Sequence, residues 1–170
     1  VPSFLMDKVS SAIPTLQASI EKWPLANPFI ISRGSKTEAE VVVVSLQSGP
    51  FVGRGECVPY ARFQESPEKT LKTILDYGAP SSREELQKTL PAGAARNALD
   101  CALWDLEAKR TGRSVPDLAQ RATPVSKTTC FTISLDTPEK MAKAAKAVPN
   151  LYLLKLKLGG DLDEDRMRAV

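Results

Sequence analysis

The 170-residue chain contains no histidine. Histidine is the commonest general base near neutral pH and the commonest ligand of transition metals, so its absence removes both uses at once. Any acid–base chemistry in this chain must therefore rely on lysine, aspartate, glutamate, tyrosine or cysteine. A metal site built on imidazole ligands is excluded.

Cysteine is scarce too, and its pattern indicates neither a disulfide framework nor a zinc site. Cys57, Cys101 and Cys130 are odd in number, far apart and in no Cys-x-x-Cys arrangement. Apolar runs are short, such as Val41 to Val44, whereas a membrane span needs roughly 20 apolar residues. We expect a soluble, cytoplasmic protein in a reducing environment.

Charge of a single sign is lacking as well. The 23 basic and 20 acidic residues are mixed along the chain and leave a net charge of +3. There is no basic block with interleaved aromatic residues, so we expect neither nucleic acid nor a membrane as a partner. A hydrophobic fraction of 42% and a charged fraction of 25% are typical of one large or two small globular domains.

The residues up to 122 predict strands followed by helices. We expect a weak strand over Leu16–Leu25, ended by Pro24 and Pro28, and then a polar loop over Phe29–Glu38. Two runs rich in valine and small residues predict a β-hairpin, and three segments with capping signals and helical periodicity predict helices. The hairpin strands are 40–46 and 51–57, and the helices are 67–77, 81–90 and 94–111.

From Thr123 onward the pattern becomes strand, helix, strand. Residues 127–135 and 151–158 predict strands, and 138–148 predicts the helix between them, which implies a parallel pair with a right-handed crossover. We therefore expect an α+β capping domain over 1–122 and, over 123–170, the first β/α units of an incomplete (β/α) TIM-like barrel. Residues 163–170 look like the first turns of a further helix, so we expect an N-terminal piece of a longer protein.

Two lysines near the end of the last strand are the main candidates for chemistry. Alternation puts Lys155 and Lys157 on one face, and both faces of the strand are mostly apolar, which is typical of a parallel strand covered on both sides. Repulsion and desolvation then favour a neutral amine, which makes one of the two a candidate base. The alternative is an edge strand whose lysines face water.

The order of parts resembles the enolase superfamily. The likeness lies in the strand end Gly-Arg-Gly-Glu-Cys, the helix Ala94–Arg110 and the strand Leu-Lys-Leu-Lys-Leu-Gly-Gly-Asp. Within the superfamily the chain is similar to the muconate-lactonising branch, and most similar to the dipeptide epimerases that act on L-Ala-D/L-Glu. Ile-Ser-Arg-Gly-Ser-Lys and Thr-Ile-Ser-Leu-Asp-Thr-Pro support the epimerases in particular.

The resemblance implies roles for four residues. Such enzymes remove the proton α to a carboxylate, and Mg²⁺ stabilises the enediolate. Lys157 resembles the lysine that exchanges this proton on one face, and Lys155 resembles its partner, which contacts the substrate carboxylate. Thr132 matches a substrate-contacting threonine, and Arg33 aligns with the arginine that binds the glutamate side chain. A bidentate guanidinium suits a carboxylate.

The same resemblance puts the three carboxylate ligands of Mg²⁺, and an opposing lysine, on barrel strands beyond residue 170. We expect no metal ligands in this chain, no turnover by it alone, and a small acidic dipeptide from murein peptide recycling as the substrate of the full-length isomerase. A homo-oligomer is left open. The alternatives are another enzyme of the branch, such as a cycloisomerase or an o-succinylbenzoate synthase, and a non-catalytic binding or assembly fragment.

Overall fold

The computed structural model describes residues 13–170, which form two compact units. One unit takes the residues up to Glu21 together with Glu40–Ala122, and the other takes Lys22–Ala39 together with Thr123–Val170. The segment Lys22–Ala39 thus has its contacts with the C-terminal residues. The domain limits 1–122 and 123–170 stay a prediction.

A three-stranded sheet is the frame of the first unit. Its strands are β1 (Thr15–Ile31), β2 (Gly34–Ser48) and β3 (Phe51–Cys57), in the order β1-β2-β3, and the hairpin residues 22–39 of β1 and β2 belong to the second unit. The last two pair antiparallel, with Val44 opposite Gly55. The hairpin expected from the valine-rich run and its neighbour is therefore confirmed.

The strand expected over residues 16–25 is confirmed, but its expected end at the prolines was wrong. One strand runs from Thr15 to Ile31 through Pro24 and Pro28, and the expected loop over Phe29–Glu38 is reduced to the turn Ser32–Arg33 between β1 and β2. The physical reason is that β1 is an edge strand. Proline lacks the N–H that a central strand needs, but an edge strand can turn that position toward solvent.

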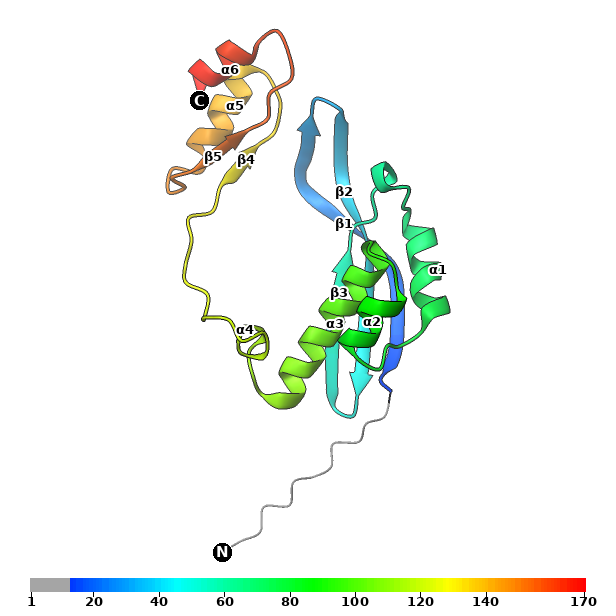
Figure 1. Cartoon of the computed structure of the whole chain (residues 1–170). Coiled ribbons are helices and arrows are strands. Elements are labelled where there is room, and N and C mark those ends of the chain that lie inside the picture. The colour runs from blue at the N-terminus through cyan, green and yellow to red at the C-terminus, as the bar shows by residue number, and fades with distance from the viewer. Residues whose placement is uncertain (1–12) are drawn as a thin grey trace, which may run out of the picture. The chain divides into compact units, whose positions relative to one another are not determined.

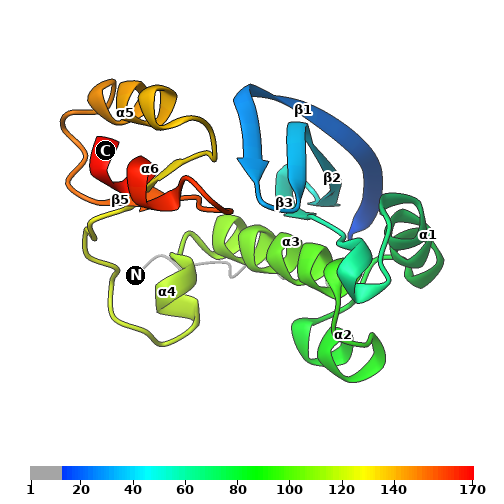
Figure 2. The same cartoon turned by 90° about the horizontal axis from the view of Figure 1, so that it is seen from above.

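Helices cover this sheet. They are α1 (Pro67–Tyr77), α2 (Arg83–Thr89), α3 (Ala94–Thr111) and the short α4 (Val115–Leu118), with a 3₁₀ turn at Ala61–Phe63. The side chains of Ser66 and Ser82 cap α1 and α2, as the sequence indicates. Helix α3 lies along the sheet, with α1 and α2 beside it (Figures 1 and 2). All three expected helices are confirmed.

Small residues let α3 approach β3 closely. A Cβ atom built on Gly55 would collide with the carbonyl oxygen of Ala98, and one built on Gly53 would collide with that of Ala102. Ala98 and Ala102 are themselves fully buried. The core that surrounds this contact contains Val42, Val44, Leu46, Ile74, Leu86, Leu99 and Leu106. The two backbones touch because neither element carries a large side chain here.

Side chains of α3 also hydrogen-bond the free edge of β3. Asn97 Nδ2 donates to the carbonyl of Glu56 (3.2 Å), Asp105 Oδ2 accepts from the N–H of Arg54 (2.7 Å), and Lys109 Nζ donates to the carbonyl of Val52 (2.8 Å). Partial burial raises the pKa of Asp105, but the hydrogen bonds from Lys109 and Arg54 outweigh it and the pKa lies below its ordinary value. A strand edge that is already bonded offers fewer groups to another chain.

The second unit contains a β-α-β arrangement. Strands β4 (Phe131–Ile133) and β5 (Leu154–Leu156) pair parallel, and α5 (Pro138–Lys146) connects them. Helix α6 (Asp163–Ala169) follows β5 and packs against α5 (Figure 1). The parallel pair and the closing helix are confirmed, and the α+β portion followed by the first units of a barrel is the fold of this chain.

Both of these strands are shorter than the sequence indicates, and the expected cover on both faces of 151–158 was wrong for this chain. Leu151 and Leu153 are exposed, and Tyr152 is 93% exposed. Ile133 of β4 is buried, as is Met141 of α5. Within the described residues, apolar burial is therefore concentrated on the helix side of this two-stranded sheet. In residues 13–170 no helix has the length and apolar character to cross a membrane.

The contact between β3 and α3 can be tested with Gly55→Ala. The added methyl group would force β3 away from the carbonyl of Ala98, so we expect a loss of roughly 1–3 kcal/mol in the free energy of unfolding. The control is Glu56→Ala, which shortens an exposed side chain on the same strand and should change the free energy of unfolding little. Urea denaturation followed by circular dichroism measures both. A Gly55→Ala protein as stable as the control would contradict this account of the packing.

Candidate active site

Three of the four residues singled out in the sequence share one face of the second unit's sheet. Thr132 pairs with Lys155 in the parallel register, so their side chains point the same way. The N–H of Lys157 donates to the carbonyl of Ile133 at 3.0 Å, which continues the ladder past β5. Alternation then gives Lys157 the same face as Lys155.

The two lysines differ in their surroundings. Lys155 is exposed, whereas Lys157 is half-buried and its Nζ lies 5.6 Å from the ring centroid of Phe29 on β1. The expected desolvation of both amines is thus not provided by the described residues. The contact described on this face is that of Lys157 with Phe29 of the hairpin.

The tip of the β1–β2 hairpin is hydrogen-bonded to the end of β4. The N–H of Leu135 donates to the carbonyl of Ile30 at 3.0 Å, and the N–H of Ile30 donates to Ser134 Oγ at 3.4 Å. Ser134 Oγ in turn donates to the carbonyl of Pro28 at 3.4 Å. The first half of the segment 22–39 is thereby anchored where β4 ends.

The turn of this hairpin rests on the loop that follows β5. A Cβ atom built on Gly159 would lie 2.9 Å from Leu135 Cδ2 and 3.0 Å from Ser32 Cβ, so only a glycine fits without displacing its neighbours. Ser32 precedes Arg33, whose side chain is exposed. The turn that carries Arg33 therefore lies at the same strand ends as Lys157.

A cleft of about 470 Å³ runs beside β4 in this unit. Its lining comes from β1, β4 and α5 and includes Asn27, Pro28, Ile30, Phe131, Thr132, Asp136, Lys140 and Met141. The hydrogen bond from the N–H of Thr137, with the Lys140 ammonium, holds the pKa of the Asp136 carboxyl below its ordinary value. Thr132 is thus both on the face of the two lysines and at the cleft.

A carboxylate fixes the loop after β5. Asp163 accepts hydrogen bonds from the N–H groups of Gly159 and Gly160, each at 3.0 Å, and from Arg166 Nη1 at 2.8 Å. These bonds, the two backbone ones first, lower the pKa of Asp163. Arg166 Nε also donates to the carbonyl of Asp136 at 2.8 Å, in the loop after β4. In the sequence, an acidic residue in the first turn of a helix is the only sign of this network.

The described residues offer no metal centre. Among residues 13–170, no three histidine, cysteine, aspartate or glutamate side chains lie close enough together to hold a metal ion. The carboxylates of the site region, Asp136 and Asp163, are both engaged with donors of the chain. They do not fit the carboxylate cluster that a bound Mg²⁺ requires.

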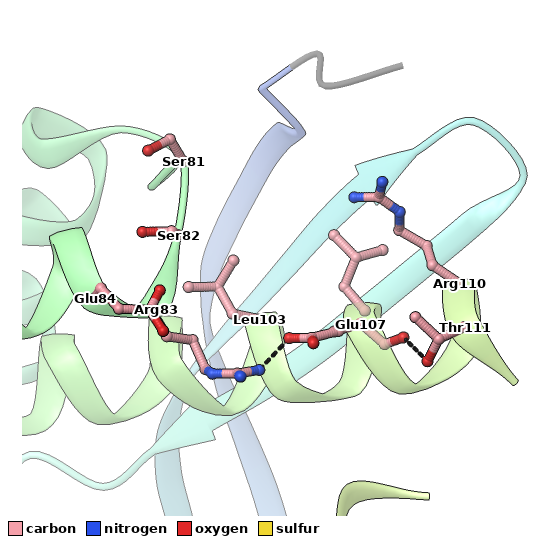
Figure 3. A pocket seen from close by; sticks show the side chains of 9 residues that line it. Ser81, Ser82, Arg83, Glu84, Leu103, Glu107, Arg110 and Thr111 are labelled. Atoms are coloured by element: carbon pink, nitrogen blue, oxygen red, sulfur yellow. Dashed lines mark hydrogen bonds and ion pairs between the residues drawn. The ribbon is translucent and has the colours of Figure 1, made fainter. Parts of the chain in front are cut away.

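A hollow in the first unit, between the start of α2 and the end of α3, carries no catalytic arrangement. Arg83 pairs with Glu107 (Figure 3). Its guanidinium also lies over the ring of Trp104, at 3.5 Å from the centroid, and Ser82 caps α2. Most of the polar side chains there are bonded to other groups of the same unit, so we assign the hollow a structural role.

Cys57 lies in a second hollow of the first unit, beside Tyr60, Phe63 and Glu65. Burial raises the pKa of this thiol to about 11, and the Glu65 carboxylate adds to the effect. At neutral pH the group is a protonated thiol, so it does not serve as a nucleophile.

Comparison with known proteins agrees with the fold. Residues 14–119 match the protein family described as "Mandelate racemase / muconate lactonizing enzyme, N-terminal domain". The L-Ala-D/L-Glu epimerase of Escherichia coli K12 is 45% identical over 163 residues, which are 92% of this chain and 50% of that protein. The chain thus spans about half the length of the curated relatives it matches.

Solved structures give the same result. A crystal structure of an enolase family member from Agrobacterium tumefaciens, with homology to dipeptide epimerases and with sodium and L-Ala-L-Glu bound, has a TM-score of 0.83 at 43% identity and covers 92% of this chain and 49% of its own. The dipeptide epimerase of Cytophaga hutchinsonii, complexed with Mg and D-Ala-L-Val, has a TM-score of 0.80 at 26% identity, with 93% and 48% covered.

The fold is that of an enolase-type capping domain followed by the first part of a barrel. The chain belongs to the mandelate racemase / muconate lactonizing enzyme family. Its relatives include dipeptide epimerases, such as the Escherichia coli protein at 45% identity, and also an N-acetyl-D-glutamate racemase of Pseudoalteromonas, which is 39% identical over 136 residues.

The hydrogen bonds to Asp163 predict a pH-dependent contribution to stability. Because its folded pKa lies below the ordinary value of 3.8, the contribution is present above that value and is lost as the pH falls through the folded pKa. We expect Asp163→Asn to lower the free energy of unfolding near neutral pH, by an amount that shrinks to zero in strong acid. Urea denaturation across this pH range measures the difference. The control is Asp165→Asn on the same helix, and an Asp163→Asn effect independent of pH would count against the assignment.

The thiols predict an order of alkylation. Cys101 and Cys130 are exposed, whereas Cys57 is buried with a pKa of about 11. With iodoacetamide at about pH 8, we expect Cys57 to react slower than Cys130 by on the order of 100-fold, because so little thiolate is present. Mass spectrometry of peptides measures the labelling, and a urea-unfolded sample is the control in which this difference should disappear. Early labelling of Cys57 in the folded protein would contradict its assigned burial.

Proposed function

We propose that this chain is the N-terminal part of a dipeptide epimerase. The enzyme removes the α-proton from the C-terminal residue of a small acidic dipeptide such as L-Ala-L-Glu and returns a proton to the opposite face. The observation that supports this most is the common face of Thr132, Lys155 and Lys157 at the ends of two parallel strands, beside the hairpin turn that carries Arg33. Catalytic groups of barrel enzymes gather at such strand ends.

Lys157 is the proposed proton acceptor. Its side chain is half-buried, and its backbone N–H makes the hydrogen bond that continues the ladder past β5. From this position the amine can reach a bound substrate while the backbone stays bonded to β4. In its neutral form it takes the proton on one face, and as an ammonium it returns one. Proton transfer of this kind requires the amine within hydrogen-bond reach of the α-carbon's proton, so its position is decisive.

Lys155 is the proposed electrostatic partner. Its ammonium points to the same face as Lys157, and it is exposed to whatever binds there. Contact with the substrate carboxylate would stabilise the negative charge that develops as the α-proton leaves. Thr132, its register neighbour, supplies a hydroxyl that can bind the dipeptide backbone.

Arg33 is the proposed specificity residue. A guanidinium on an exposed turn can take a carboxylate with two parallel hydrogen bonds, and the side chain of a C-terminal glutamate presents one. The hydrocarbon-like acids used by other enzymes of the branch do not need such a partner. This favours an acidic dipeptide, of the kind released in murein peptide recycling, as the substrate.

Magnesium is part of the proposal only for the longer protein. The Cytophaga hutchinsonii relative is complexed with Mg, but the described residues of this chain do not provide the ligands. We place the ligands outside these 170 residues, and the proton acceptor for the other face with them. By itself the chain holds one side of the reaction.

Proton exchange in deuterated buffer with Mg²⁺ tests this function. The full-length protein that carries this chain should exchange and epimerise L-Ala-L-Glu, while the 170-residue chain alone should not. Arg33→Ala should raise KM for L-Ala-L-Glu by roughly 10- to 100-fold, the cost of one charge-assisted clamp, and change KM for L-Ala-L-Phe far less.

The matched control is Lys36→Ala, which removes a positive charge from the same hairpin outside the turn. It should leave the ratio of the two KM values unchanged. Equal losses with both dipeptides on Arg33→Ala would refute Arg33 as the specificity residue. Absence of exchange by the full-length protein would refute the proposed function itself.

A further inference from the structure

The two loops that follow β4 and β5 are joined by one largely covered arginine. The side chain of Arg166 is 13% exposed, although it lies on a short helix at the surface of the unit. Its Nε donates to the carbonyl of Asp136 after β4, and its Nη1 donates to Asp163, at 2.8 Å each. One planar guanidinium thus holds two segments that are separated in the chain by α5 and β5.

Asp163 passes this connection on to the backbone. Its two carboxylate oxygens accept from consecutive N–H groups, those of Gly159 and Gly160, at 3.0 Å each. A carboxylate with three donors has little freedom, and charge-assisted hydrogen bonds of this kind are stronger than neutral ones. The loop is therefore fixed two residues after Lys157.

Gly159 is also the point at which the hairpin turn rests. The absence of a side chain there brings Ser32 Cβ to 3.0 Å from where a Cβ would lie. A displacement of Gly159 must therefore move the turn that carries Arg33 or open a gap beneath it. The same displacement would shift the end of the strand that carries Lys157.

We propose that Asp163 and Arg166 are positioning residues for the epimerase reaction, holding Lys157 and the Arg33 turn in register at the ends of β4 and β5. This role rests on the proposed function, although neither residue touches substrate. An arginine suits the role because its planar fork of N–H groups spans two separate acceptors at once, whereas the donors of a lysine all leave one nitrogen. A mere helix-start interaction would need Asp163 but not the bond from Arg166 to the other loop.

Exchange at the two epimers separates positioning from general stability. Epimerisation takes a proton from one face and delivers it to the other, so each epimer offers its α-proton to a different group. One epimer presents its α-proton to Lys157. In the full-length protein, Arg166→Met and Asp163→Asn should slow exchange of that α-proton with solvent by on the order of 100-fold, the effect expected when a catalytic group is misplaced by about 1 Å. Exchange from the other epimer should slow much less, and the KM ratio for L-Ala-L-Glu and L-Ala-L-Phe should move toward that of Arg33→Ala.

Two further variants complete the comparison. Arg166→Lys keeps the charge and one contact, so its epimer ratio should lie between those of the native protein and Arg166→Met. Arg168→Met removes a fully surface-exposed pair with Glu164 on the same helix and should leave both ratios unchanged. Equal slowing of both epimers by Arg166→Met and Arg166→Lys would overturn the proposal, because loss of folded protein acts on both faces alike.

Hydrogen exchange of the 170-residue chain gives an answer that does not depend on activity. In Asp163→Asn, an amide group replaces one acceptor, so the N–H of Gly159 or of Gly160 should exchange roughly 10- to 100-fold faster than in the native chain. NMR measures both amides. Unchanged protection of both amides would overturn the positioning role, even if the enzyme is an epimerase. Faster amide exchange, together with a full-length protein that turns over no dipeptide, would support the fixed loop but refute the proposed function.

Discussion

The close contact between β3 and α3 is the constraint on which the first unit depends. Two glycines on the strand meet two alanines on the helix, and the backbones come so near that a single added methyl group has no room. Because the helix lies so close to the strand, the polar side chains of α3 reach the backbone groups at the free edge of β3. The aliphatic core then fills the space between the sheet and the flanking helices α1 and α2. The packing and the hydrogen bonding of this unit are thus consequences of the same approach.

Much of the fold could be predicted because its signals are local. The β2–β3 hairpin and α3 follow from short-range alternation, turn residues and an alanine stripe. Strand β1 could not be predicted in this way, since Pro24 and Pro28 are compatible with a strand only at an edge, and edge position is a property of the whole sheet. Strands β4 and β5 are shorter than predicted. Apolar composition indicates which residues can be buried, but the neighbouring helices and strands decide which residues are buried.

The site shows a sharper division. The position of Lys155 and Lys157 near a strand end singled them out, strand alternation predicted their common face, and the family resemblance added their roles. Their desolvation could not be inferred, because it depends on neighbours that are distant in sequence, such as Phe29 beside Lys157. The bond from Arg166 to the carbonyl of Asp136 was invisible for the same reason: a backbone acceptor 30 residues away leaves no mark on composition or spacing. Residues with suitable chemistry can thus be recognised in a sequence more readily than the contacts that position them.

The bonded edge of β3 has a consequence for biosynthesis. This strand is made before α3, and until the helix forms its outer N–H and C=O groups are open to any extended chain nearby. Helix α3 brings its own donors and acceptors in Asn97, Asp105 and Lys109, which follow their partners on β3 by 41, 51 and 57 residues. The hazard therefore ends once this helix has been made and has folded onto the strand. A nascent cap can therefore protect itself while the remainder of a long polypeptide is still being translated.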